Sequence, residues 1–342
     1  MDRLGGRAED TVSKWAWRAL LVAAIAVGAF LRFDHLGEPS YWLDEIIHQH
    51  QTDFVAAKAW WRWFGPISVE NAGLYYLTQL ATRVFGTSEL AGRSAAALLG
   101  VATIPLLGFV PLDRRTRAAA VILLAVSPLH VYYSREARPY ALLLFLTAAL
   151  MIILLRGRSI AAAVIVLLAM AYSSAVASPV VASAAAISFL IAFVDRERRR
   201  WYATVGACAV VALAWFRFIY GPRPAVDPSW PGFPAMDWAF ATSLARMFSV
   251  SALGTEIAGR AATAMFVFAL IGGVVLMRRD RVHGIVLIGM TVLPFAISMI
   301  ALRAYDHFFA VRYVIAALIG YVLLAAIGMA AVVSRAPAAL TI

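Results

Sequence analysis

Long apolar runs separated by short polar breaks dominate this chain. A helix needs roughly 20 residues to cross a hydrocarbon layer about 30 Å thick, and the runs are of that order. The pattern therefore predicts about ten transmembrane helices in an all-α, polytopic membrane protein. We expect them at residues 15–33, 91–112, 118–132, 139–155, 159–176, 179–194, 201–220, 261–277, 282–302 and 310–333, of which the third is short.

Two of the breaks are long, at residues 34–90 and 221–260. The first is half polar and rich in tryptophan and tyrosine, which predicts helices lying in the headgroup layer. The second is rich in proline and aromatic residues. This composition is typical either of an ordered loop that covers a substrate or of a connector without a role of its own. We expect one integral membrane domain over residues 1–342, with no soluble domain after the last span.

Composition and charge agree with this interpretation. The chain is 63% hydrophobic and 14% charged, with mean hydropathy +0.80, which excludes a soluble globular domain. Its formal charge is +11, but 17 of the 30 basic residues and only 7 of the 19 acidic ones fall at the termini and in alternate short breaks. The positive-inside rule then puts both termini in the cytoplasm and residues 34–90 outside. No single basic face exists for a nucleic acid to bind.

Three acidic residues lie beside predicted spans, where a carboxylate is costly unless it meets water, a cation or a substrate. Asp44 and Glu45 occur in YWLDEIIH, residues 41–48, and Glu136 occurs in YYSREARPYALL, between Arg135 and Arg138. The alternatives are a solvated loop charge for Asp44 and an ion pair with the neighbouring arginines for Glu136.

A metal site is also conceivable near the first acidic pair. Asp44 and His48 are four residues apart, which aligns side chains on a helix, and His50 follows. Imidazole with carboxylate suits zinc or manganese, so a divalent metal is possible. The alternative is ordinary polar lining for the two histidines. Cys208 is the single cysteine, which excludes a disulfide within the chain.

Several blocks of sequence resemble bacterial membrane glycosyltransferases of the C superfamily, close to the protein mannosyltransferase-like group. The blocks are YWLDEIIHQHQTDF, LYYLTQLATRVFGTSELAGRSAAALLGVATIPLLGF and SPLHVYYSREARPYALLLFLTAAL, with weaker similarity in FSVSALGT and HFFAVRYVIAALIGY. The resemblance implies an enzyme of the inner (plasma) membrane that moves a sugar from a polyprenyl-phosphate carrier to an envelope lipid, glycan or protein hydroxyl. The active site would lie on the extracytoplasmic face.

The same resemblance implies roles for individual residues. Asp44 matches the catalytic aspartate, with Glu45 beside it, and Glu136 matches a second acidic position. Candidates for binding the carrier phosphate and substrate are Lys58, Arg135, Arg138, Arg312 and Tyr133. These residue types suit the chemistry, because a carboxylate can take a hydroxyl proton as general base while cations stabilise a departing phosphate. A single displacement with one base would invert the anomeric centre.

The chain departs from the family pattern at Asn71-Ala72-Gly73 and at Tyr172-Ser173-Ser174, which leaves the sugar and the acceptor open. Two other classes of protein predict different features. A transporter or flippase of lipid-linked sugars should show repeated halves and acids near the midplane, and neither is found. A non-catalytic lipid-binding partner of another transferase should lose the acids, yet Asp44, Glu45 and Glu136 are present.

Overall fold

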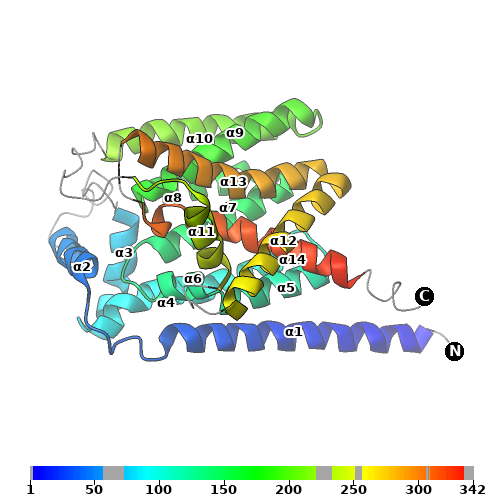
Figure 1. Ribbon diagram of the computed structural model, residues 1–342, viewed down its shortest axis with the longest axis horizontal. Helices are drawn as coiled ribbons and strands as arrows, with labels where there is room; N and C mark the ends of the chain where they lie inside the picture. Colours follow the sequence, from blue (N-terminus) through cyan, green and yellow to red (C-terminus); the bar gives the residue numbers. More distant parts are fainter. Residues whose placement is uncertain are drawn as a thin grey trace.

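The computed structural model describes residues 3–56, 73–220, 233–250, 256–305, 307 and 309–334, and no strand forms among them. Most helices run lengthwise in one bundle, with α1 (Arg3–Phe33) along one side (Figure 1). The all-α prediction is confirmed. The other α-helices are α2 (Leu43–Ala56), α3 (Gly73–Thr82), α4 (Glu89–Leu106), α5 (Arg114–Val126), α6 (Pro128–Ser134), α7 (Tyr140–Arg156), α8 (Ile160–Ala171), α9 (Ser178–Val194), α10 (Arg199–Tyr220), α11 (Trp238–Val250), α12 (Glu256–Arg279), α13 (Arg281–Ala304) and α14 (Ala317–Val333).

Every apolar run predicted from the sequence contains a helix, but not every helix has the length of a span. Among the described residues, five segments are long and apolar enough to cross a membrane, so the chain is a membrane protein. They are Trp15–Phe33, Glu89–Phe109, Ala175–Val194, Gly259–Arg279 and Arg281–Ala304. The count rises to six if α5 and α6 form one broken span, and the expected ten are not confirmed.

Breaks inside the apolar runs account for part of this difference. The predicted span 118–132 is divided into α5 and α6, whose axes differ by 55°. Pro128, the first residue of α6, has no N–H to continue the backbone hydrogen bonds of α5. Ser127 is the N-cap of α6, and its side chain accepts a hydrogen bond from the His130 N–H. The run 159–176 likewise ends its helix at Ala171, followed by a turn.

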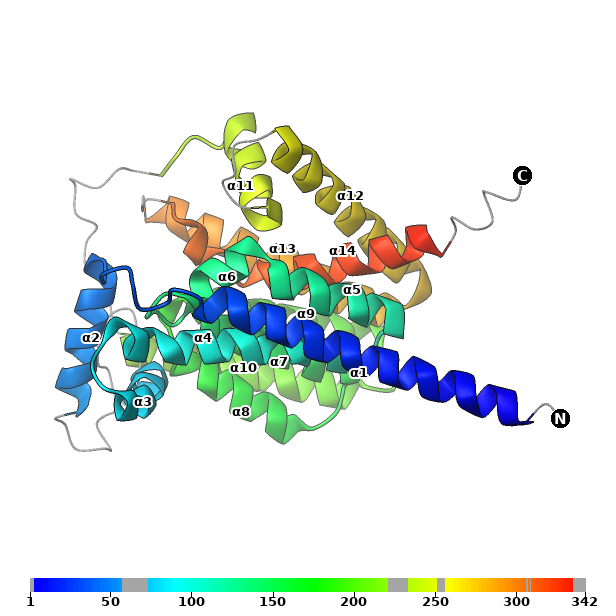
Figure 2. The ribbon, with the colours of Figure 1, turned by 90° about the horizontal axis from the view of Figure 1, so that it is seen from below.

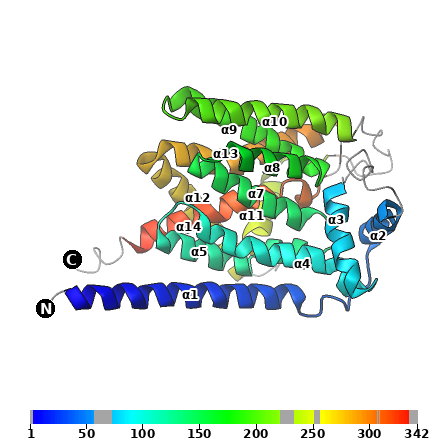
Figure 3. The same ribbon diagram turned by 180° about the vertical axis from the view of Figure 1, so that it is seen from behind.

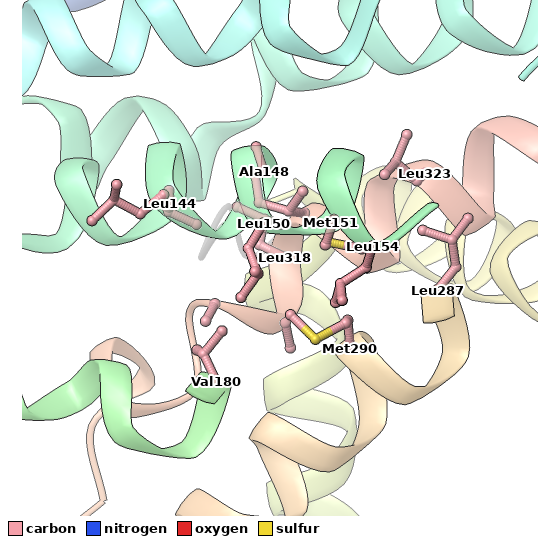
Figure 4. Close-up of a cluster of buried hydrophobic side chains, with 14 of the residues drawn as sticks. Leu144, Ala148, Leu150, Met151, Leu154, Val180, Leu287, Met290, Leu318 and Leu323 are labelled. Atoms are coloured by element: carbon pink, nitrogen blue, oxygen red, sulfur yellow. The ribbon is translucent and has the colours of Figure 1, made fainter. Parts of the chain in front are cut away.

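The core is centred on α7, which is apolar all round and buried over most of its length. Its leucines and Met151 meet Val180 of α9, Leu287 and Met290 of α13, and Leu318 and Leu323 of α14 (Figure 4). Close packing also joins α12 and α14, where a methyl group added at Gly272 would lie 1.9 Å from the Leu324 carbonyl oxygen. Large side chains are excluded from that crossing.

The two ends of the bundle differ. The described chain begins at one end, where the turns between α9 and α10 and between α12 and α13 also lie (Figures 1 and 3). Helices α2 and α3 lie at the opposite end, which we call the site end, while α11 and α12 lie along the side away from α8 (Figure 2). Of the predicted outer segment 34–90, residues 57–72 lie outside the described part, so its full length as one loop is not confirmed.

Candidate functional site

Asp44 and Glu45 open helix α2, where carboxylates are favoured by the positive end of the helix dipole. Successive side chains on a helix point in different directions, and the two acids separate accordingly. The Asp44 side chain keeps 26% of its surface exposed, whereas that of Glu45 keeps none. The adjacent acids therefore have different environments.

Glu45 is held in a buried ion pair with Arg93 of α4. Arg93 donates from Nε to Oε1 at 2.9 Å and from Nη2 to Oε2 at 2.6 Å, and the Ala137 N–H donates to Oε1 at 2.7 Å. Arg93 also donates to the carbonyl oxygens of Leu36, Pro39 and Ser40. Bidentate, charge-assisted bonds of this kind fix geometry, so this arrangement suits Glu45 to joining α2, α4 and the turn 135–139 rather than to proton transfer.

Asp44 lies between two arginines that come from distant parts of the chain. Its Oδ2 is 3.7 Å from Arg138 Nη2 and 4.0 Å from Arg312 Nη2. Arg138 belongs to the turn between α6 and α7, and Arg312 to the short 3-10 helix Val311–Tyr313 before α14. The separations exceed hydrogen-bond length, so these are electrostatic contacts. A carboxylate and two guanidinium groups thus converge at the site end.

Aromatic and imidazole groups hold Arg138 in place. Its guanidinium donates to Tyr140 Oη at 3.1 Å and lies 5.5 Å from the centre of that ring. It also contacts Nδ1 of His48, a buried residue of α2 that stacks on Tyr76 with ring centres 6.3 Å apart. Since the Arg138 side chain is only 6% exposed, its charge acts in a medium of reduced dielectric.

Glu136 lies in the same turn and is 8% exposed. Its Oε2 has no hydrogen-bond partner among the described residues. Burial raises the pKa of Glu136 to about 7, and nearby Glu45 also raises it, while a hydrogen bond from Tyr132 and the charges of Arg138 and Arg312 oppose the shift. A buried carboxyl group that titrates near neutrality beside two cations is typical of functional sites.

This pKa shift leads to a prediction about stability. The folded protein binds the Glu136 proton more tightly than the unfolded chain does, so this residue lowers stability as pH rises from about 4.5 to about 7. Glu136→Gln removes that loss. We expect the free energy of unfolding of the variant, relative to that of the parent, to be higher at pH 8 than at pH 5, by up to about 3 kcal/mol. Denaturant unfolding in detergent at both pH values measures this, and an equal difference at both would contradict it.

The other expected binding residues do not all reach Asp44. Arg135 turns to α1, where its Nη1 donates to the carbonyl oxygens of Leu31 at 3.0 Å and Asp34 at 2.6 Å. Tyr133 is buried with its ring edge against Tyr140, at 5.0 Å between centres. Lys58 falls outside the described residues.

The three residues considered for a metal site do not converge in the described part of the chain, and a divalent metal stays a prediction. His48 faces Arg138, His50 is exposed, and no group of three or more histidine, cysteine, aspartate or glutamate residues converges within the described ranges. A cation at Asp44 would require Arg138 or Arg312 to move away, because like charges repel. The two guanidinium groups beside Asp44 suit this part of the site to an anionic group.

Sequence reasoning missed Arg93 and Tyr140 and gave His48 a different role. Arg93 had a detectable signal, because a charged residue inside an apolar run is rare and marks a specific partner. Tyr140 had none, since an aromatic residue at the start of a membrane helix is common.

Comparison with known proteins supports the fold. No family model matches the chain, and a search of curated proteins finds no match. The structure is similar to the oligosaccharyltransferase of Archaeoglobus fulgidus in its apo form, at 12% identity and a TM-score of 0.58, covering 94% of this chain and 51% of that one. It is also similar to the complex of that protein with zinc and sulfate, at 14% identity and a TM-score of 0.55, covering 92% and 49%.

The chain thus spans about half the length of the oligosaccharyltransferase that it resembles. At such low identity the similarity shows the fold alone. What this chain shares with that archaeal protein is therefore its fold.

Proposed function

We propose that this protein is a membrane glycosyltransferase that moves a sugar from a polyprenyl-phosphate carrier to a hydroxyl of an envelope lipid, glycan or protein. The reaction takes place on the extracytoplasmic face of the inner membrane. The observation that carries the proposal is the convergence of Asp44 with Arg138 and Arg312, at 3.7 and 4.0 Å. The sequence blocks that resemble the protein mannosyltransferase-like group contain all three residues, and we place the protein near that group.

The residues divide the reaction between them. Asp44 takes the proton of the acceptor hydroxyl, whose oxygen forms a bond to the anomeric carbon. The bond from that carbon to the phosphate oxygen breaks, its electron pair stays on the phosphate, and polyprenyl phosphate leaves. Arg138 and Arg312 stabilise the negative charge that develops on that phosphate. Their effect is strong because the site is partly shielded from water. One displacement of this kind inverts the anomeric centre.

Two alternatives make different demands on the same residues. A flippase needs the cations to hold a lipid phosphate but has no use for a general base. A non-catalytic partner needs neither acid. The position of Asp44 beside both arginines, with Glu136 buried nearby, favours a transferase over either.

A donor screen tests the proposal. Purified protein in detergent is offered labelled polyprenyl-phosphate sugars with lipid, glycan and peptide acceptors, and reactions without protein serve as the reference. We expect transfer from at least one lipid-linked donor. Turnover with a nucleotide sugar and none with lipid-linked donors would overturn the donor class. Flipping of the donor without transfer, measured after reconstitution into vesicles, would support the transporter alternative.

The phosphate-binding role of the arginines is separately testable. Arg138→Ala or Arg312→Ala should each weaken donor binding by roughly 10- to 100-fold, because a charge-assisted bond contributes roughly 1.5–3 kcal/mol. Arg303→Ala is a suitable control, since Arg303 is an exposed arginine in the last turn of α13. Binding of a labelled lipid-phosphate sugar measures the effect. Equal donor affinity in all three variants would mean that neither arginine holds the phosphate.

The proposed location of the site depends on topology. Asp53 is an exposed residue of α2 at the site end, and Cys208 is the only native cysteine. We expect Asp53→Cys, in a Cys208→Ala background, to react with an impermeant thiol reagent added to the outer face of intact cells. If it reacts only after the inner face is opened, the site is cytoplasmic and a lipid-linked donor on the outer leaflet cannot reach it.

A further inference from the structure

One arginine of α1 is buried without taking part in the site. Arg32 lies in the last turn of α1, and its residue surface is 0% exposed. Removing a guanidinium from water at membrane depth is costly unless it is compensated by partners. Its presence there therefore requires a structural reason.

The reason lies in the break between α5 and α6. At this break the last carbonyl groups of α5 lose their normal helical partners, and no lipid can replace them. Arg32 donates to the carbonyl oxygens of Ala125 at 3.0 Å and Leu124 at 3.3 Å. It also lies 2.6 Å from Nδ1 of the buried His130, in the first turn of α6. Arg32 thus joins the end of α1 to both halves of the broken span.

A second arginine makes the opposite connection. Arg135 follows α6, and its donations to Leu31 and Asp34 satisfy carbonyl groups at the end of α1. Helix α1 therefore supplies an arginine to carbonyl groups at the end of α5, and the turn after α6 supplies one to carbonyl groups at the end of α1. We call Arg32 and Arg135 the arginine clasp.

Helix α4 packs tightly beside the clasp. A methyl group added at Gly100 would lie 2.2 Å from Ser134 Oγ and 3.1 Å from Arg32 Nε. Only a residue without a side chain allows α4 to approach the end of α6 so closely. The turn that begins at Arg135 is consequently held from the α1 side by the clasp and from the α4 side by this contact.

The position of the clasp in the chain links it to both parts of the site. Glu136 and Arg138 follow Arg135 directly in the turn, and Asp44 lies on the segment that continues from the end of α1. Beyond the clasp, the bond from the Ala137 N–H to Glu45 connects the same two segments again. Movement of α1 against α6 would change the distance between Asp44 and Arg138.

We propose that Arg32 and Arg135 are reciprocal positioning residues, which lock the end of α1 to the α5–α6 break and thereby set the spacing between Asp44 and the Glu136–Arg138 turn. The kinetic consequence rests on the proposed function, but the mechanical one does not. Neither arginine touches the reacting groups.

Hydrogen exchange measured by mass spectrometry tests the mechanical consequence without any substrate. In Arg135→Gln and Arg32→Met we expect faster exchange in peptides covering residues 31–45 and 127–139, and unchanged exchange in α12, α13 and α14. Arg156→Gln is the matched control, because Arg156 also donates to a backbone carbonyl, that of Phe109 at 2.8 Å, far from the clasp in the sequence. It should leave both site peptides unchanged.

Transfer kinetics test the functional consequence. For folded, monodisperse protein we expect kcat to fall roughly 10- to 100-fold in either variant, since small displacements at a reacting centre are costly. The donor KM should change less, because Arg312 is not held by the clasp. Arg32→Lys keeps the charge and one donor group and should recover part of kcat. The double variant should lose less than the product of the single losses, because both residues act on one spacing.

The two kinds of failure are distinguishable. If the parent protein transfers no sugar, the proposed function fails, and the exchange data still decide the clasp. Unchanged exchange in residues 127–139 of Arg135→Gln overturns the clasp. So does exchange that rises equally throughout α12, α13 and α14, which would indicate general loss of structure. If Arg32→Met does not fold, Arg135→Gln and Arg32→Lys give the same decision.

Discussion

Replacing Asp44 by asparagine should reduce sugar transfer by about 10²–10⁴-fold, the usual contribution of a general base. The amide keeps the shape of the side chain but cannot accept the acceptor proton. Donor binding should not weaken, because the variant removes a negative charge beside Arg138 and Arg312, which hold the phosphate. Initial rates with a lipid-linked donor and a separate binding assay measure the two effects.

Asp53→Asn provides a matched control on the same helix. Asp53 is exposed and pairs with Arg83 at 2.8 Å, so its loss should leave transfer near the parent rate. Asp44→Glu should keep only a trace of activity, because the longer side chain displaces the carboxylate. Transfer by Asp44→Asn at near the parent rate would show that Asp44 is not the base, and Glu136 would be the next residue to test.

Replacing Arg93 by methionine should destabilise the protein by about 3–5 kcal/mol, because it leaves the fully buried Glu45 carboxylate without its cation. The backbone carbonyls of residues 36, 39 and 40 lose a donor as well. The double variant Arg93→Met, Glu45→Gln removes the unpaired charge and should be less destabilised than the sum of the single variants. Denaturant unfolding in detergent measures all of these free energies.

The pair of Arg83 and Asp53, in which only the aspartate is exposed, is the control for this prediction. Its N···O distance of 2.8 Å is similar to that of the buried pair, but the Asp53 side chain is 64% exposed. Arg83→Met should therefore cost less than about 1 kcal/mol. A similar loss in Arg93→Met and Arg83→Met would contradict the assigned importance of burial.

Much of the fold could be predicted from the amino-acid pattern. Long apolar runs without charges, such as residues 179–194 and 282–302, form helices α9 and α13 because a buried backbone must satisfy its own hydrogen bonds. The run 118–132 was harder, because its apolar character is continuous while Ser127 and Pro128 divide it into two helices at 55°. Hydropathy averages over a window and does not register such a local break.

The candidate site was predicted only as separate residues. Asp44, Glu136 and Arg138 were recognisable because charged groups beside apolar runs need partners, and Arg312 through a weak resemblance. Their grouping was not, since Arg312 follows Asp44 by more than two hundred residues, and only the packing of the intervening helices brings the two side chains together.

The sequence by itself determined that this chain forms apolar helices in a membrane and that a few charges gather beside them, because both follow from local hydropathy and residue type. The tertiary structure decided what each charge does. It turned Asp44 toward Arg138 and Arg312 and its neighbour Glu45 toward Arg93, and it directed Arg135 to α1 instead of to Asp44. The physical reason is that an ionic side chain takes its role from the partners and the burial that distant segments provide, and local sequence contains neither.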